Sequence, residues 1–229
     1  MPLSSGLKIK RLKTMPLYKT INISSTAGTN TKILVWKITE SFDELHDEVV
    51  LNMKNRIRLD NMKSDLHQRG FLSVRKLLQE AGYNDLDLYY DEFGKPHLND
   101  GKHISITHSH HFSAIIVSDE TVGIDIELQR EKIIRIADKF ADEEFTYLDK
   151  NNQEEYIKKL TVIWGAKEAI FKIRNEKGIS FKDHIKVKRF QLEDKEFRAE
   201  LHFDELVKEF EIFHEEIEDF GLVYAFEKK

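Results

Sequence analysis

The sequence predicts an α+β fold made of two halves. Segments that alternate apolar and polar residues, typical of strands, occur in both parts of the chain together with segments of helical periodicity. The chain of 229 residues is long enough to bury one large core or two small ones. We expect the halves at residues 15–118 and 119–229. Residues 1–14 are polar and basic without periodicity, and we expect them to form a disordered arm.

In the first half, strands are expected at 18–23, 32–38 and 103–109, and helices at 42–51 and 66–81. Residues 54–63 either continue the first helix or form a linker. Two apolar segments at 113–118 and 121–127 flank Asp119 and Glu120, which predicts a hairpin.

In the second half, short amphipathic helices are expected between residues 133 and 148, followed by a long helix from 153 to 173. Asn152 is a suitable N-cap with Glu155 three residues on, and residues 175–178 stop the helix. The tail alternates at 185–192, 197–203, 207–213 and 220–226, which predicts four antiparallel strands.

The composition excludes several classes of protein. Hydrophobic residues make up 40% and charged residues 34%, which is typical of a soluble globular protein. The absence of cysteine excludes disulfides, thiol catalysis and thiolate metal sites. A net charge of -5 argues against general nucleic-acid binding. We find neither a membrane span nor a secretory signal, so we expect no membrane contact and, by elimination, a cytoplasmic protein.

Two carboxylates share one face of the strand at 122–127. Asp125 and Glu127 alternate with buried apolar residues and lie about 6.6 Å apart, close enough to converge on one hard cation. Gly123 lies on the same face, where it leaves room for a ligand to approach the backbone. Taken alone, this pattern is more typical of a solvated strand face.

Glu168 and Lys172 stand four residues apart on the long helix and share a face. A third carboxylate near the first two would complete an oxygen-rich Mg²⁺ site, and the lysine would neutralise a phosphoryl group. The simpler interpretation is a surface ion pair that contributes a few tenths of a kcal/mol.

Together, the strand GIDIE at 123–127 and the helix WGAKEAIFK at 164–172 resemble the two hallmark motifs of the 4′-phosphopantetheinyl transferases. Gly165 departs from the pattern, since a small hydroxyl residue is usual there and its possible hydrogen bond is lost. The length resembles the larger, single-chain branch of the family. The resemblance implies a pseudo-two-fold arrangement of two similar α+β halves, a cofactor in the cleft between them, and a monomer.

The resemblance also implies an activity. The family transfers the 4′-phosphopantetheine group from coenzyme A to a serine of an apo acyl or peptidyl carrier protein, with Mg²⁺, and releases 3′,5′-ADP. Asp125, Glu127 and Glu168 are expected to bind Mg²⁺. Glu168 is also expected to act as general base, directly or through a water, and Lys172 to meet the phosphate charge and protonate the leaving group.

Further residues are expected to contact coenzyme A. Lys95 lies in a G-K-P turn that resembles the family's phosphate-binding turn, and Thr107 and His108 lie in a strand that resembles its 3′-phosphate site. Arg75, on the helix at 66–81, and Lys167, next to Glu168, are expected as additional phosphate contacts.

Other functions stay open at this point. His108, His110 and His111 are close enough in sequence for a transition-metal cluster. The acidic residues with a following lysine also loosely resemble metal-dependent nucleases or phosphodiesterases, which place the acid and lysine two apart on a strand. A catalytically inactive carrier-binding module is a third alternative. The carrier, its pathway and the choice between free and acyl coenzyme A are not set by the sequence.

Overall fold

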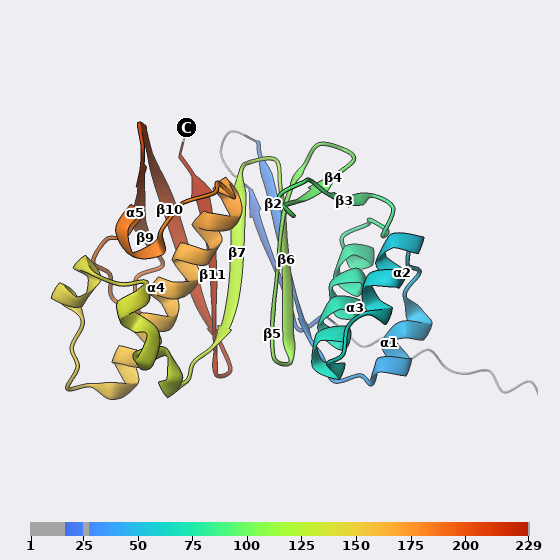
Figure 1. The fold of residues 1–229 in the computed structure, drawn as a ribbon, viewed down its shortest axis with the longest axis horizontal. Helices are drawn as coiled ribbons and strands as arrows, with labels where there is room; N and C mark the ends of the chain where they lie inside the picture. The colour runs from blue at the N-terminus through green and yellow to red at the C-terminus, as the bar shows by residue number, and fades with distance from the viewer. Residues whose placement is uncertain (1–16, 25–27, 229) are drawn as a thin grey trace, which may run out of the picture.

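The computed structural model describes residues 17–24 and 28–228; the predicted arm at residues 1–14 lies outside them. Two sheets lie face to face in the middle of the molecule, and helices cover the outer side of each (Figure 1). The strand order is β1-β2-β6-β5 in the first sheet and β7-β11-β10-β9-β8 in the second. The predicted α+β class is therefore confirmed.

The first sheet and its helices come from the first half of the chain. Its strands are β1 (Lys19–Ser24), β2 (Asn30–Lys37), β5 (His103–Ser109) and β6 (Phe112–Ser118), all antiparallel to their neighbours. Its helices are α1 (Phe42–Glu48), α2 (Met53–Asp60) and α3 (Asp65–Glu80), and the small hairpin of β3 (Leu88–Tyr90) and β4 (Pro96–Leu98) follows them. The segment left open at 54–63 is a separate helix because the Asn52 side chain caps it by accepting from Asn55 N at 2.9 Å.

The second sheet contains β7 (Val122–Leu128), β8 (Ile185–Val187), β9 (Glu196–Phe203), β10 (Leu206–Ile217) and β11 (Phe220–Glu227). Its last four strands form the predicted antiparallel meander. The 3₁₀ helices η1 (Glu131–Lys139) and η2 (Glu143–Tyr147) precede the long helix α4 (Gln153–Arg174), and the short α5 (Phe181–His184) follows it.

The predicted hairpin between residues 113–118 and 121–127 is wrong. Both edges of β6 are already paired, with β2 on one side and β5 on the other. The chain therefore leaves the first sheet after Ser118, and β7 pairs with β11 at the edge of the second sheet. Sequence alternation gives the strands themselves but not their partners, which is why neighbours in the chain were assigned to one sheet.

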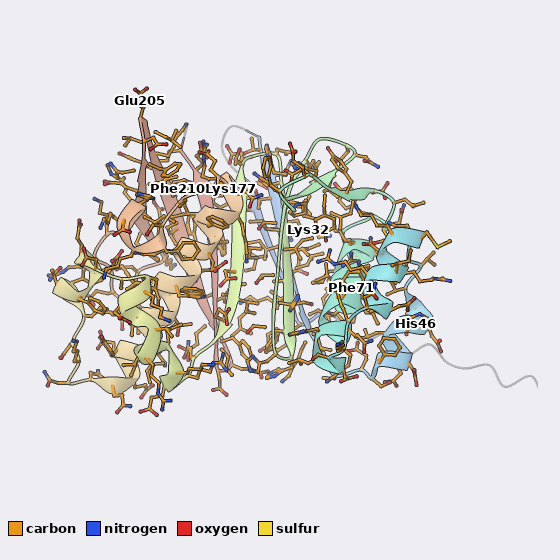
Figure 2. The ribbon with its side chains drawn as sticks, viewed as in Figure 1. Lys32, His46, Phe71, Lys177, Glu205 and Phe210 are labelled. Atoms are coloured by element: carbon orange, nitrogen blue, oxygen red, sulfur yellow. The ribbon has the colours of Figure 1, made fainter. Side chains whose placement is uncertain are left out.

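Among the described residues, three apolar cores hold the layers together. Ile33 and Ile116 from the first sheet meet Ile124 and Leu222 from the second, and all four are fully buried. Side chains fill the space that separates the two sheets in the ribbon view (Figure 2). The other two cores lie between each sheet and its own helices.

Helix α4 begins and ends as predicted. Asn152 accepts from Glu155 N at 3.3 Å, and Asn175, with a φ of 50°, ends the helix in the left-handed conformation. Within residues 17–24 and 28–228, neither α4 nor any other helix is long and apolar enough to cross a membrane.

Close contact between α4 and β7 depends on Gly123. A Cβ atom at this position would lie 2.0 Å from the carbonyl oxygen of Ala169 in α4. The space at Gly123 is thus filled by helix backbone, and the expectation that a ligand approaches there is wrong. The missing side chain is what lets the helix that carries Glu168 lie directly on the strand that carries Asp125.

We expect Gly123→Ala to lower the free energy of unfolding by about 3 kcal/mol or more, because a backbone carbonyl cannot move aside as a side chain does. Gly221→Ala is the matched control: this strand glycine of β11 also faces α4, but its Cβ would lie 3.5 Å from Thr161 Cγ2, an ordinary contact. Urea unfolding of both variants measures the difference. Equal losses of stability would contradict the role given to Gly123.

Candidate functional site

The edge strands of the two sheets, β5 and β7, lie side by side but are not paired through their backbones. Instead, backbone N–H groups of β7 donate to hydroxyls of β5. Ile124 N donates to Ser105 Oγ at 3.2 Å, and Ile126 N donates to Thr107 Oγ1 at 3.3 Å. The side chains hold the two edges apart, and a cavity lies beside them.

This cavity has a volume of about 600 Å³ and is lined by residues of both halves. A volume of this size suits a small-molecule ligand. Its lining side chains that carry or accept charge come from α2, α3, the turn before β4, β5, β7 and α4: Arg58, His67, Arg75, Lys95, Thr107, His108, Asp125, Glu127, Glu168 and Lys172.

The three predicted carboxylates line the same cavity. Asp125 is 3% exposed, and its Oδ1 accepts from Thr107 Oγ1 at 3.0 Å. Ser109 Oγ donates to Glu127 Oε2 at 3.1 Å. Glu168 reaches the cavity from α4.

Burial and mutual repulsion raise the pKa values of two of these acids, Glu168 and Glu127. Burial raises the pKa of Glu168 to about 7, and the negative charges of Asp125 and Glu127 act in the same direction. Burial, followed by the charge of Asp125, also raises the pKa of Glu127. Groups that disfavour each other's charge in this way gain from a shared cation.

Lys172 supplies positive charge to the cluster. Its Nζ donates to Asp125 Oδ1 at 2.8 Å and to the carbonyl of Ile124 at 3.0 Å. The helix thus brings Glu168 and Lys172 to β7 together, as their spacing of four residues predicts. This lysine is not the solvent-exposed i,i+4 partner of Glu168 that the simpler interpretation expected.

In the described part of the chain, no three His, Asp or Glu side chains converge into a set of metal ligands. However, Asp125 Oδ2 is buried and has no hydrogen-bond partner there. Carboxylate oxygens of this kind suit Mg²⁺ in donor chemistry and in charge. The histidine cluster expected as an alternative is also absent from the described residues.

Gly165 is one reason why Asp125 Oδ2 has no hydrogen-bond partner among the described residues. A Cβ atom at Gly165 would lie 3.6 Å from Asp125 Oδ2 and 2.9 Å from Val223 Cγ2. The position therefore faces the carboxylate, and its space is taken by Val223. The hydroxyl that is usual there in the resembled family is missing from the side of Asp125 that lacks a partner.

Basic side chains line the rest of the cavity. His108 has its pKa lowered by burial and by the neighbouring His67, whose ring centroid is 6.5 Å away. Lys95 donates from Nζ to the carbonyl of Ile173 near the end of α4, and burial lowers its pKa. Both residues line the cavity, and their roles as phosphate contacts stay predictions.

Arg75 lies deeper than its prediction as a phosphate contact implies. It is 3% exposed, its Nε pairs with Asp85 Oδ1 at 3.2 Å, and its guanidinium lies 3.5 Å from the centre of the Phe71 ring. Only Nη2 has no partner among the described residues. One nitrogen of Arg75, with two N–H donors, is thus left for a ligand, while the rest of the group holds α3 to the segment before β3.

Lys167 is not brought to the cavity. It is fully buried, and its Nζ pairs with the equally buried Glu144 at 2.7 Å. The same ammonium donates to three carbonyls, of Phe140 at 2.6 Å, Ile185 at 2.7 Å and Phe181 at 2.9 Å. With all of its donors used, Lys167 ties η1, η2 and α5 to α4 and has none for a phosphate.

Sequence reasoning missed Arg58. It lines the cavity from α2, and its guanidinium lies 5.5 Å from the Phe71 ring and 5.4 Å from the Tyr90 ring. The sequence carries a signal for it, because the Asn52 cap starts a helix whose second turn contains this arginine. An interpretation of residues 54–63 as a continued helix or a linker does not assign Arg58 to a helix face.

Residues 121–225 match the sequence model of a family described as the 4′-phosphopantetheinyl transferase superfamily. The chain is 32% identical over 107 residues to the 4′-phosphopantetheinyl transferase gsp of Aneurinibacillus migulanus, an alignment that covers 45% of each protein. It is 28% identical over 149 residues to the 4′-phosphopantetheinyl transferase ffp of Bacillus subtilis, covering 62% of this chain and 66% of that one. The chain thus matches between about half and two thirds of these relatives. The predicted family resemblance is confirmed.

Removing the buried lysine tests its structural role. We expect Lys167→Met to lower the free energy of unfolding by about 3–5 kcal/mol, because Glu144 is left charged and buried without its partner. Lys158→Met on the same helix is the control, since Lys158 pairs with the exposed Glu154 and Glu216, and such pairs contribute about 0–1 kcal/mol. Urea unfolding compares the two. Similar losses would show that Lys167 is not a buried link.

The raised pKa of Glu168 predicts a pH effect on stability. Without metal, the folded protein holds the Glu168 proton up to about pH 7, whereas the unfolded chain loses it near its ordinary value of 4.5. The stabilisation from this proton is present at low pH and is lost as pH rises through about 7. In EDTA, the stability of Glu168→Gln should therefore increase relative to wild type between these pH values. A pH-independent difference in urea unfolding would contradict this.

Proposed function

We propose that the protein transfers the 4′-phosphopantetheine group from coenzyme A to a serine of an apo acyl or peptidyl carrier protein and releases 3′,5′-ADP. The gsp and ffp relatives, named for this transferase activity, support the proposal. The monomeric state and the identity of the carrier stay predictions.

One observation carries the proposal: acidic and basic side chains line the same cavity between the halves. Asp125, Glu127 and Glu168 line it from the second half of the chain, and Arg58 and His108 line it from the first. A cation site beside anion-binding groups is what a metal-bound diphosphate requires. Coenzyme A carries such a diphosphate and a separate phosphate on its ribose.

Glu168 and Lys172 supply the two proton transfers of the proposed reaction. The serine oxygen of the carrier forms a bond to the phosphorus that bears the pantetheine arm, and the bond from this phosphorus to the oxygen of 3′,5′-ADP breaks. Glu168 accepts the serine proton; in the metal-free protein, burial and the charges of Asp125 and Glu127 raise its pKa to about 7. Lys172, within reach of the cluster, neutralises charge on the phosphates and donates a proton to the leaving group.

Mg²⁺ would be held by Asp125, Glu127 and Glu168, and when bound it would neutralise charge on the diphosphate. Asp125 Oδ2 supports this assignment because it is buried without a partner in the described residues. Lys95, His108, Arg58 and the free Nη2 of Arg75 are proposed as phosphate contacts. Thr107 has its single proton on Asp125, so its proposed contact with the 3′-phosphate would need a change of partner.

The alternatives fit less well. A nuclease needs access for a long polyanion, whereas the acidic cluster here lies in a cavity between the halves. An inactive carrier-binding module has no need for carboxylates whose pKa values are raised by burial and, to a smaller extent, by repulsion from a neighbouring carboxylate. Both stay measurable outcomes of the experiment below.

Conversion of an apo carrier to its holo form tests the proposal. With coenzyme A and Mg²⁺, wild type should add the mass of one phosphopantetheine group to the carrier, as measured by mass spectrometry. Glu168→Gln should lower the rate by about 10²–10⁴-fold, because the general base is lost.

Glu154→Gln, an exposed position at the start of the same helix, is the matched control and should keep the wild-type rate. No mass gain on any of several carriers would overturn the transferase proposal and leave the inactive module. Mg²⁺-dependent cleavage of DNA that is lost in Glu168→Gln would instead establish the nuclease.

A further inference from the structure

Alternate residues of β5 present hydroxyls to β7. Ser105, Thr107 and Ser109 stand two apart, so they share one side of the strand, and each bonds to β7 in a different way. Ser105 accepts from backbone only, Thr107 contacts backbone and Asp125, and Ser109 contacts the Glu127 side chain only. From Ser105 to Ser109, the group of β7 that is bonded therefore changes from a backbone N–H to a carboxylate.

The direction of the Ser109 bond follows from the donors available. An ionised carboxylate only accepts, so Ser109 Oγ donates its one proton to Glu127 Oε2 at 3.1 Å. His110 Nδ1 lies 3.3 Å from Ser109 Oγ, and because the Ser109 proton is used on Glu127, this nitrogen can only donate to Ser109 Oγ. Ser109 is 9% exposed, so little water competes for this bond.

Thr107 orients the second carboxylate in the same manner. Its Oγ1 accepts from Ile126 N at 3.3 Å, so its proton is directed to Asp125 Oδ1 at 3.0 Å. Lys172 donates to that oxygen as well. The other oxygen, Oδ2, is left without a partner among the described residues. One oxygen of Asp125 is fixed by neighbours, and the other is left for a ligand.

We infer that Ser109 and Thr107 are positioning residues that hold Glu127 and Asp125 for cation binding, so that a strand of the first half orients metal ligands of the second. This inference rests on the proposed function only for the identity of the cation site. The glutamate has the most to gain, because its side chain loses more rotamer freedom on being held. Hydrogen-bond partners of metal ligands have this effect in other metal sites.

Binding of Mn²⁺, used as a paramagnetic probe for Mg²⁺, tests the inference without carrier or coenzyme A. Electron paramagnetic resonance measures free Mn²⁺ and gives the dissociation constant. We expect Ser109→Ala to raise this constant about 10- to 100-fold. Ser109→Thr keeps the hydroxyl and should restore the wild-type value, and Thr107→Val should weaken binding as Ser109→Ala does.

Ser105→Ala is the matched control. It removes the same hydroxyl from the same strand, but its bond partner is the backbone of Ile124 and no carboxylate. Ser105→Ala loses its buried bond from Ile124 N, and Ser109→Ala loses its contacts with Glu127 and His110, so thermal unfolding of both variants measures the loss of stability that accompanies each change. The Mn²⁺ affinity of Ser105→Ala should equal that of wild type. Weakened binding in both variants would assign the effect to general loss of structure and overturn the inference.

The outcomes separate this inference from the transferase proposal. If wild type modifies no carrier but Ser109→Ala still weakens Mn²⁺ binding, the positioning role stands and the proposed activity is wrong. If wild type modifies a carrier and Ser109→Ala binds Mn²⁺ as wild type does, with an unchanged Mg²⁺ requirement, the positioning role is wrong. Absence of Mn²⁺ binding by wild type also overturns it.

Discussion

The unpaired seam between β5 and β7 is the constraint on which the rest of the structure depends. Edge strands usually present free N–H groups, and here the N–H groups of Ile124 and Ile126 are satisfied by hydroxyls rather than by a strand. A backbone ladder would have merged the two sheets and closed the space between them. Hydroxyls join the halves while they keep a cavity of about 600 Å³ beside the seam.

The other side of β7 is equally constrained. Two positions without side chains, Gly123 on the strand and Gly165 on the helix, let α4 lie against the second sheet. The helix then delivers one acid and one base, Glu168 and Lys172, to the strand that carries Asp125. The acidic cluster therefore forms on β7, which contacts the hydroxyls of β5 and also packs closely against α4.

Much of this was predictable from local pattern. The ends of α4 follow from Asn152 and Asn175, and the shared face of Glu168 and Lys172 follows from their spacing. What local pattern lacks is partner choice. The pairing of β7 with β11 depends on strands almost a hundred residues apart, and β6 had no free edge for β7. The Lys167 side chain points about 100° away from that of Glu168 around the helix axis. Only the structure shows that Glu144 and three carbonyls surround its ammonium.

The Lys167 ammonium joins segments from both sides of α4 in the sequence. Its partners Phe140 and Glu144 come before the helix, and Phe181 and Ile185 come after it. Because burying an ammonium without partners is costly, complete burial of Lys167 requires both flanking segments to be packed on α4. A truncation or displacement on either flank therefore reaches the helix that carries Glu168 and Lys172.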